Sequence, residues 1–473
     1  MMQSTALTIS NGVQVVVPDS LDLITPYVLY EQHDWFEDEI KFLRHLLQPG
    51  QKVIDIGANY GVYTLSMAQV VGPNGYVWAF EPASTTADFL AEGIAANHFD
   101  HITLERSALS NTKNGTAQLS LNQNSELNEL LRDGRQADAS ETVPLVTMDD
   151  RMSAYGWRDI DFVKIDAEGE EGNILKGGGR FFSELSPLVQ YEVKAGDKVH
   201  MELVQAFAEL GYAPYRLVPG LRLLAPFDAR SPLDPYLLNL FCCKPDCARR
   251  LADRGYLVTA TSSHTVASEN AADGGVAERL GDLGIYHWRN VLAKLHYGNQ
   301  LAGLWEQTMA GGRGEEVGAA LALYAASKDF ALSPGKRLGA LEVSYTKFKT
   351  ICENEPSYLR LSSLARVARD YGARAIAVNA LGQLSNNIFR DQQINMGEPF
   401  LVAGERFDSI SPAKENLGNW VLAAILEEYE RLASYSSFYT QNSARQRLEI
   451  IHNLGFGSEE MRRRLSLLQK LYP

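Results

Sequence analysis

Apolar and polar positions follow two different periods over the first 250 residues. Short apolar runs typical of buried strands occur at 53–56, 76–80, 102–105, 161–165 and 188–193. Apolar positions with helical spacing occur between these runs, at 64–71 and 85–97, and after the last of them, at 203–210. This alternation predicts an α/β fold with a parallel sheet covered on both faces. Further apolar runs at 214–218 and 236–242 would close the sheet.

The flanking segments are less regular. Residues 7–9 and 13–17 predict two short strands around an Asn11-Gly12 turn, and 31–46 have helical spacing. Residues 115–121 alternate like an antiparallel edge strand, whereas the polar stretch 122–141 predicts a mobile loop.

The pattern changes after about residue 250. Residues 259–282 are rich in Ser, Thr, Ala, Gly and Asp, which indicates a linker. From 285 onward the apolar residues recur at helical spacing, without a catalytic motif. We therefore expect a first domain over 1–250, a linker over 251–284, and an all-helical domain, a candidate helical-hairpin array, over 285–473.

The strand-to-helix junction at 53–64 carries the clearest functional signal. Gly57 and Gly61 follow the apolar run, and such a junction brings backbone N–H groups close to a ligand. About twenty residues later a second apolar run ends in Glu81, where doubly wound folds bind a ribose diol. Two cofactor classes fit. A dinucleotide site normally shows three glycines as G-x-G-x-x-G, and the wider Gly57-x-x-x-Gly61 spacing favours a ligand without pyrophosphate, such as S-adenosylmethionine.

Three segments resemble one known family. Asp55-Ile56-Gly57-Ala58-Asn59-Tyr60-Gly61 resembles the D-x-G-A-N-x-G loop of the FkbM-type methyltransferases, and Lys164-Ile165-Asp166-Ala167-Glu168-Gly169-Glu170-Glu171 resembles their K-I-D-x-E-G-x-E signature. Thr147-Met148-Asp149-Asp150 is similar to their T-L-D-D element. The resemblance covers roughly residues 25–250. It implies a class I (Rossmann-like) sheet with an antiparallel edge, S-adenosylmethionine as methyl donor and, most often, a hydroxyl acceptor.

Position along the predicted sheet assigns the cofactor-binding residues. We expect the methionine and ribose parts near Asp55, Gly57, Asn59 and Gly61, the ribose hydroxyls on Glu81, and the adenine beside Ser107 and Ala108.

The acceptor side is assigned to Lys164, Asp166, Glu168 and Glu192. Residues 164, 166 and 168 would point the same way along a strand, and burying such charges is costly unless they pair or bind something. Two interpretations remain open. One is an ion-paired network with Asp166 as general base and no metal. The other is a divalent metal held by oxygen ligands, with Asp166, Glu168 and Asp150 as the first candidates.

Composition narrows the partners. The net charge of −14 argues against a nucleic-acid partner, because phosphate binding requires a basic surface. No apolar run is long enough to span a membrane, and neither a targeting signal nor a metal-binding Cys/His pattern is visible. We therefore expect a cytoplasmic protein.

The combined prediction is an S-adenosylmethionine-dependent O-methyltransferase that acts on a hydroxyl of a sugar, glycan or polyketide-like acceptor. A nicotinamide-dependent oxidoreductase and an inactive methyltransferase-like scaffold are the alternatives. The helical part would serve acceptor capture, homo-oligomerisation or binding of a protein partner, since its apolar stripes need cover.

Overall fold

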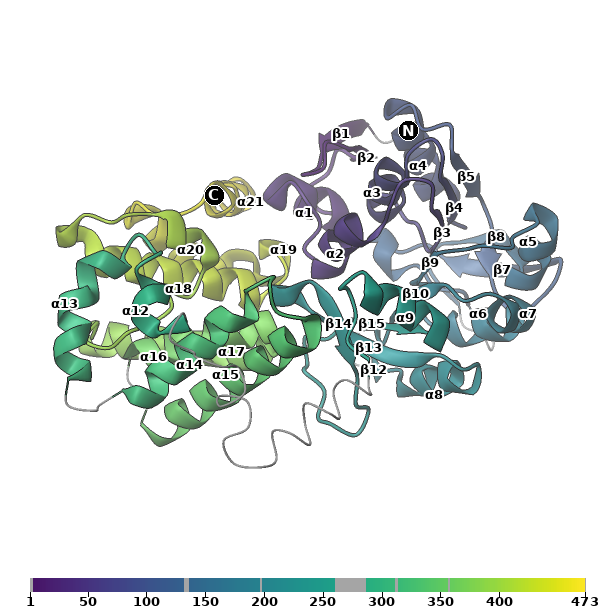
Figure 1. The fold of residues 1–473 in the computed structure, drawn as a ribbon. Coiled ribbons are helices and arrows are strands. Elements are labelled where there is room, and N and C mark those ends of the chain that lie inside the picture. Colours follow the sequence, from purple (N-terminus) through teal and green to yellow (C-terminus); the bar gives the residue numbers. More distant parts are fainter. Residues whose placement is uncertain are drawn as a thin grey trace. The chain divides into compact units, whose positions relative to one another are not determined.

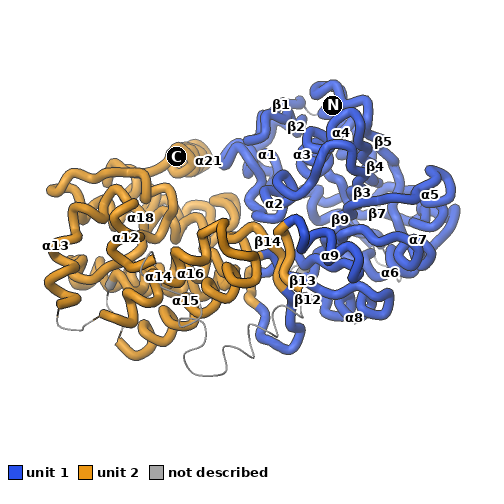
Figure 2. Tube along the Cα trace, in the orientation of Figure 1, with its two compact units in different colours: residues 1–217, 226–233, 237–254 blue, residues 218–225, 234–236, 255–473 orange. Residues whose placement is uncertain are grey.

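The computed structural model describes residues 3–131, 136–195, 198–259, 286–310, 314–355 and 358–472 (Figure 1). The chain divides into two compact units (Figure 2). Unit 1 comprises Met1–Leu217, Pro226–Leu233 and Leu237–Arg254, and unit 2 comprises Val218–Ala225, Asp234–Tyr236 and Gly255–Pro473. Most of the linker expected at 251–284 falls on 260–285, which lie outside the described residues.

Unit 1 alternates strands and helices. Its strands are β1 (Ser4–Thr8), β2 (Gln14–Pro18), β3 (Lys52–Ile56), β4 (Tyr76–Phe80), β5 (Ile102–Glu105), β6 (Ala108–Leu109), β7 (Gly115–Ser120), β8 (Ser140–Val146), β9 (Phe162–Ile165), β10 (Leu188–Glu192), β11 (Lys194–Ala195), β12 (Lys198–Val199), β13 (Ala213–Val218) and β15 (Asn239–Cys243). Its helices are α1 (Ile24–Gln32), α2 (Asp38–Leu46), α3 (Val62–Val71), α4 (Ser84–Ala96), η1 (Ser125–Leu127), α5 (Met148–Tyr155), α6 (Glu171–Gly177), α7 (Gly179–Glu184), α8 (Met201–Glu209) and α9 (Pro245–Asp253).

The central sheet of unit 1 confirms the expected fold class. Seven of its strands are hydrogen-bonded in the order β13-β15-β10-β9-β3-β4-β5. Strands β10, β9, β3, β4 and β5 are mutually parallel, whereas β15 runs antiparallel to both of its neighbours. This is the α/β sheet with an antiparallel edge that the resemblance to class I methyltransferases implies.

The two faces of the sheet differ in polarity. One face packs an apolar core, which includes Ile54, Ile165 and Tyr191, against α5, α6, α7 and α8. The residues aligned with one another on β3, β9 and β10 at the opposite face are polar, namely Asp55, Lys164 and Gln190. All three are buried. A polar layer therefore crosses the middle of the sheet, close to the carboxyl ends of its strands.

Two segments differ from the sequence-based expectation. The spacing over 31–46 predicts one helix, but the structure has α1 and α2 with a break between them. Helix α1 is buried on nearly every side, so its sequence shows no amphipathic period. The segment 122–141, expected to be a loop, contains η1 and the start of β8. Strand β8 pairs with β6 and β7 in a separate small sheet.

The described residues of unit 2 form α-helices and short 3-10 helices (η), together with strand β14 and one isolated β-bridge. It contains β14 (Leu223–Pro226), η2 (Pro219–Leu221), α12 (Trp288–Leu292), α13 (Gly298–Met309), α14 (Glu315–Ser327), α15 (Pro334–Asn354), α16 (Tyr358–Tyr371), α17 (Arg374–Asp391), η4 (Glu405–Ser409), η5 (Lys414–Asn416), α18 (Leu417–Ala433), α19 (Ser437–Thr440), η6 (Gln441–Ala444), α20 (Arg445–Asn453) and α21 (Glu459–Leu471).

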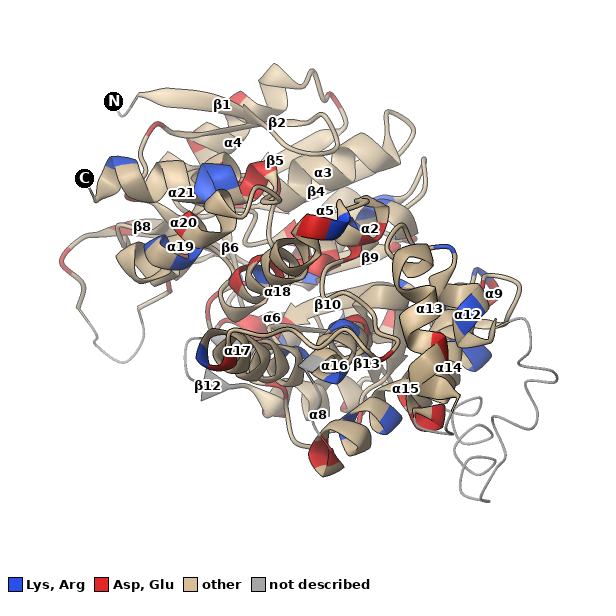
Figure 3. Cartoon of the chain, turned by 90° about the vertical axis from the view of Figure 1, so that its left-hand side faces the viewer, with Lys and Arg blue, Asp and Glu red and all other residues tan. Residues whose placement is uncertain are grey.

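Consecutive long helices pack against each other from α14 to α18. Their core contains a buried aromatic group that includes Tyr297, Trp305 and Trp420. Acidic and basic residues both occur along these helices (Figure 3), and the buried Glu427 on α18 pairs with Arg406 and Arg431. Among the helices described, none combines the length and apolarity required to cross a bilayer.

The two units are interleaved in sequence. The segment 218–225 leaves the sheet strand β13 and joins the core of unit 2 through Val218, Leu221, Leu223 and Ala225. The Lys328 ammonium donates to the carbonyl oxygen of Gly220 at 2.8 Å, which fixes this segment on the helices. A cut near residue 250 would separate these side chains from the core that buries them.

We expect a fragment that ends at Arg254 to retain the sheet but to unfold at a lower temperature than unit 1 does in the full chain. Its Val218 and Leu223, both fully buried in the full chain, would face water. Circular dichroism and binding of a hydrophobic dye measure the effect. The double substitution Leu221→Ser and Leu223→Ser should reduce dye binding by the fragment, and a fragment that binds no dye without these changes would contradict the expectation.

Candidate functional site

A pocket of about 1030 Å³, including its open mouth, lies where the parallel strands end. Gly57, Glu81, Ser107 and Asp166 follow β3, β4, β5 and β9 respectively, and all four line it. In open α/β sheets this edge is where ligands bind. Six of the seven expected cofactor-binding residues line the pocket, namely Asp55, Gly57, Asn59, Glu81, Ser107 and Ala108.

Glu81 is buried and holds the loop after β3. Its carboxylate accepts from the backbone N–H of Asn59 at 2.8 Å and of Ala83 at 2.9 Å. Burial raises the pKa of Glu81 to about 7, although both backbone hydrogen bonds oppose this. A carboxylate has about four lone-pair positions, and these bonds use two of them. Glu81 therefore retains acceptor capacity toward the pocket.

The loop 57–61 does not offer free N–H groups, contrary to the expectation from the sequence. Gly57 and Ala58 both donate to the Phe80 carbonyl at 3.0 Å, and Gly61 donates to the Ala58 carbonyl at 2.8 Å. The N–H of Asn59 donates to Glu81, and that of Tyr60 donates to the Asn59 side chain at 2.8 Å. Every N–H of the loop is thus satisfied within the protein.

The two glycines of the loop serve packing. A Cβ on Gly57 would lie 1.7 Å from the Asp166 carbonyl oxygen, and a Cβ on Gly61 would lie 2.3 Å from Cδ1 of Leu90. Both residues have positive φ angles, of 77° and 87°. Gly61 does not line the pocket, unlike the other expected cofactor-binding residues, and its lack of a side chain allows α3 to pack closely against α4.

Lys164 is the central charge of the polar layer. Its ammonium lies 2.7 Å from Oδ2 of Asp166 and 4.8 Å from the centre of the Tyr63 ring. Burial alone would lower the pKa of Lys164, but the charges of Asp166, Asp55 and Glu37 outweigh it and raise that pKa. The lysine is therefore held as a cation and neutralises part of a carboxylate-rich region.

Asp55 lies beside Lys164 on the sheet and is fully buried. Its Oδ2 accepts from the Thr64 hydroxyl at 2.6 Å. Its Oδ1 is buried without a hydrogen-bond partner among the described residues. Burial raises the pKa of Asp55, and the charge of Lys164 opposes the rise. A buried carboxylate oxygen without a partner is costly, so this atom is suited to a donor on a ligand.

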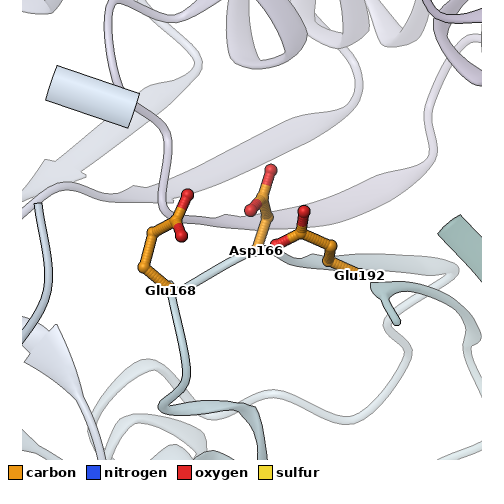
Figure 4. A group of neighbouring side chains, drawn as sticks. All are labelled: Asp166, Glu168 and Glu192. Carbon is orange, nitrogen blue, oxygen red and sulfur yellow. The ribbon is translucent and has the colours of Figure 1, made fainter. Parts of the chain in front are cut away.

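The carboxylates of Asp166, Glu168 and Glu192 converge (Figure 4), each with an oxygen within 4.8 Å of the others. Strand β9 ends at Ile165, and Glu168 has a left-handed φ of 47°. The expected strand alternation therefore does not explain the grouping, which comes from a tight turn. Burial first, and then the neighbouring carboxylates, raise the pKa of Glu168 to about 8 and that of Glu192 to about 10.

Asp150, expected as a metal candidate, lies apart from this group. Its carboxylate pairs with Lys113 at 2.6 Å, and its N–H donates to the Thr147 side chain at the start of α5. Asp149 accepts from the backbone N–H groups of Arg180 and Phe181, at 3.1 and 2.8 Å. The Thr147–Asp150 element therefore caps α5 and connects it to α7.

Two walls of the pocket come from segments without a recognisable motif. The first contributes Thr25, Trp35 and Glu37, and the second contributes Ser125, Glu126, Asn128 and Leu130. The walls are joined, because Glu126 accepts from the backbone N–H of Thr25 at 3.1 Å. Neither segment has a regular pattern of apolar residues or a known motif. Only the position of Trp35 just before the acidic start of α2 could have suggested that it lines a ligand pocket.

Comparison with known proteins agrees with this geometry. Residues 55–214 match the methyltransferase FkbM domain. No curated protein matches. The N-terminal part of the chain thus contains an FkbM-type, S-adenosylmethionine-dependent methyltransferase domain.

Three similar solved structures each cover less than half of the chain. The methyltransferase FkbM from Methylobacillus flagellatus KT is 18% identical over 42% of this chain and 45% of its own, with a TM-score of 0.29. A SAM-dependent methyltransferase from Aquifex aeolicus is 14% identical over 46% and 93%, with a TM-score of 0.27. An rRNA methylase from Streptococcus thermophilus is 10% identical over 44% and 93%, with a TM-score of 0.25.

We expect Gly57→Ala and Gly61→Ala each to destabilise the protein by about 1–3 kcal/mol or more, because the added methyl group overlaps atoms of neighbouring segments. Gly156→Ala is the matched control, since Gly156 also has a positive φ (66°) but nothing lies within 4 Å of the position that its Cβ would take. Thermal unfolding without cofactor measures all three. Equal destabilisation by the three changes would mean that backbone strain, and not packing, requires the glycines.

We expect Glu81→Gln to weaken binding of S-adenosylhomocysteine about ten- to a hundredfold, since a charged acceptor for ribose hydroxyls is lost. The ionised carboxylate accepts better, and the pKa of Glu81 is about 7, so wild-type affinity should fall as the pH drops below that value and level off above it. Calorimetry across this range measures both effects. The exposed Glu92→Gln is the control, and an unchanged pH dependence in Glu81→Gln would contradict the assignment.

Proposed function

We propose that this protein transfers a methyl group from S-adenosylmethionine to a hydroxyl of a small-molecule or glycan acceptor. The observation that carries the proposal is the adjacency of two sets of groups in one pocket. Glu81 and Asp55 present unused carboxylate acceptors at the ends of β4 and β3. Asp166 and Glu168 line the same pocket after β9.

The residues fit the cofactor. Glu81 would accept from the ribose hydroxyls, and Oδ1 of Asp55 would accept from the ammonium of the methionine part. Ser107 and Ala108 would border the adenine. When bound, the cofactor supplies an electrophilic methyl group on a positively charged sulfur. The surplus of carboxylates around the pocket suits that positive charge.

The acceptor hydroxyl must lose a proton during methyl transfer. The methyl donor does not take up this proton, so a group of the protein must accept it. Glu168, on the turn after β9, is suited to accept this proton. Its pKa of about 8 is close to physiological pH, which favours general-base catalysis. Asp166 is bonded to the Lys164 ammonium at 2.7 Å, which fixes its orientation. We therefore assign Glu168 as the base, Asp166 and Lys164 as positioning groups, and Glu192 as the third carboxylate of the group, while burial and the charges of Asp166 and Glu171 keep Glu168 basic.

The alternatives have less support. A dinucleotide needs free backbone N–H groups for its pyrophosphate, whereas the N–H groups of residues 57–61 all donate within the protein. An inactive scaffold would not require a raised pKa on Glu168 or an unpartnered oxygen on Asp55. The carboxylate group could also bind a divalent metal, but the Lys164 ammonium already occupies one oxygen of Asp166.

We expect Glu168→Gln to lower kcat/KM for methyl transfer about 100- to 10,000-fold while cofactor binding stays nearly intact. In the wild type, kcat/KM should rise as the pH approaches the pKa of about 8, because the base must be ionised to accept the proton. Transfer of labelled methyl from S-adenosylmethionine to candidate acceptors measures the profile.

Two comparisons sharpen this test. Asp166→Asn should lower kcat without removing the pH dependence, and Glu184→Gln, an exposed carboxylate on α7, should change neither. Loss of activity with a chelator and its recovery with magnesium would instead assign the carboxylates to a metal. Unchanged turnover in both Glu168→Gln and Asp166→Asn would place the acceptor elsewhere.

A further inference from the structure

The charges that line the pocket are strongly unbalanced. Among the described lining residues the carboxylates outnumber the single cation, Lys164, by seven to one; they are Glu37, Asp55, Glu81, Glu126, Asp166, Glu168 and Glu170. The Lys164 ammonium is already bonded to Asp166. The cofactor brings positive charge to its own part of the pocket only. No second cation among the described lining residues balances the other carboxylates.

An aromatic ring is fixed at the same wall. Trp35 lines the pocket, and its backbone N–H donates to Oδ1 of Asp34 at 2.8 Å. Arg44 donates to both oxygens of Asp34, at 2.7 and 2.8 Å, and to the Ser66 hydroxyl on α3 at 3.1 Å. The turn that carries Trp35 is thus fastened to the helices that cover the sheet.

Glu37 lies close to Trp35 in the same wall of the pocket. Its carboxylate accepts from the Trp35 indole and from the Tyr63 hydroxyl, and it faces the charge of Lys164. Burial raises the pKa of Glu37. Trp35 and Glu37 line the pocket two residues apart in the chain, and an aromatic ring with a nearby carboxylate is a typical environment for an ammonium group.

Resting on the proposed function, we propose that the acceptor carries a protonated amino group, which Trp35 and Glu37 hold in the pocket beside the hydroxyl that is methylated. A protonated nitrogen has no free electron pair, so it is bound and the hydroxyl is methylated. Trp35 and Glu37 precede the residues 55–214 that match the family, so this subsite belongs to the N-terminal segment.

Other ligands fit less well. A phosphate group would meet carboxylates and no free cation among the described lining residues. A divalent metal at Asp166 would sit beside the Lys164 ammonium, 2.7 Å from Oδ2. The unpartnered Oδ1 of Asp55, which the proposed function gives to the cofactor ammonium, is on a fully buried side chain of the same pocket and is a further acceptor there without a hydrogen-bond donor among the described residues.

Calorimetry on the full chain, saturated with S-adenosylhomocysteine, tests the subsite with two probes that differ at one position. Glucosamine carries an ammonium group where glucose carries a hydroxyl. We expect glucosamine to bind about tenfold or more tightly than glucose, and glucosamine 6-phosphate to bind more weakly than glucosamine. Trp35→Leu and Glu37→Gln should each reduce the preference for glucosamine about fivefold or more, with little effect on S-adenosylhomocysteine, and Glu184→Gln should not reduce it.

Equal binding of glucosamine and glucose, or no binding of glucosamine to protein that binds S-adenosylhomocysteine, would overturn the subsite. So would magnesium binding that displaces glucosamine, because the carboxylates would then belong to a metal. Failure of the wild type to bind S-adenosylhomocysteine would contradict the proposed function itself. Because Glu37 is partly buried and hydrogen-bonded, unfolding temperatures accompany each variant, and Trp35→Leu gives a second reading if Glu37→Gln does not fold.

Discussion

The buried ammonium of Lys164 organises the methyltransferase unit. A cation inside a sheet is costly unless carboxylates surround it, and here Asp55 and Asp166 do so from the neighbouring strand and from the following turn. The same carboxylates then need either the lysine or a ligand to balance them. The carboxylates that balance the buried Lys164 ammonium therefore also lie near the strand ends, where the pocket opens. Stability and ligand binding rest on one set of groups.

Sequence patterns were sufficient for the central sheet and for the residues at its strand ends that line the pocket. The strand predicted at 76–80 has the bounds of β4, and Glu81 lies at its end, facing the pocket. These residues were predictable because strand ends in a parallel sheet share one edge. The roles of Gly57 and Gly61 were not. Their neighbours, the Asp166 carbonyl and Leu90, are distant in sequence, so only the packed structure shows that both glycines are packing residues.

The two pocket walls that contain Trp35 and Ser125 were not predictable for a related reason. Trp35 and Glu37 lie between two helices, and Ser125 and Glu126 lie in a polar stretch without periodicity. Their positions depend on hydrogen bonds between segments about one hundred residues apart, such as that from Thr25 to Glu126. The interleaving of 218–225 with the helical unit was likewise hidden, because the local pattern of β13 and β14 is that of a continuous pair of strands.

The Asn59 side chain joins the two halves of the pocket. It has a left-handed φ of 49°, and its Oδ1 accepts both from the backbone of Tyr60 and, at 2.9 Å, from the hydroxyl of Ser125 on the opposite wall. One side-chain oxygen therefore connects the loop after β3 with the wall that contains Ser125, so a replacement of Asn59 that removes this oxygen would loosen both segments at once.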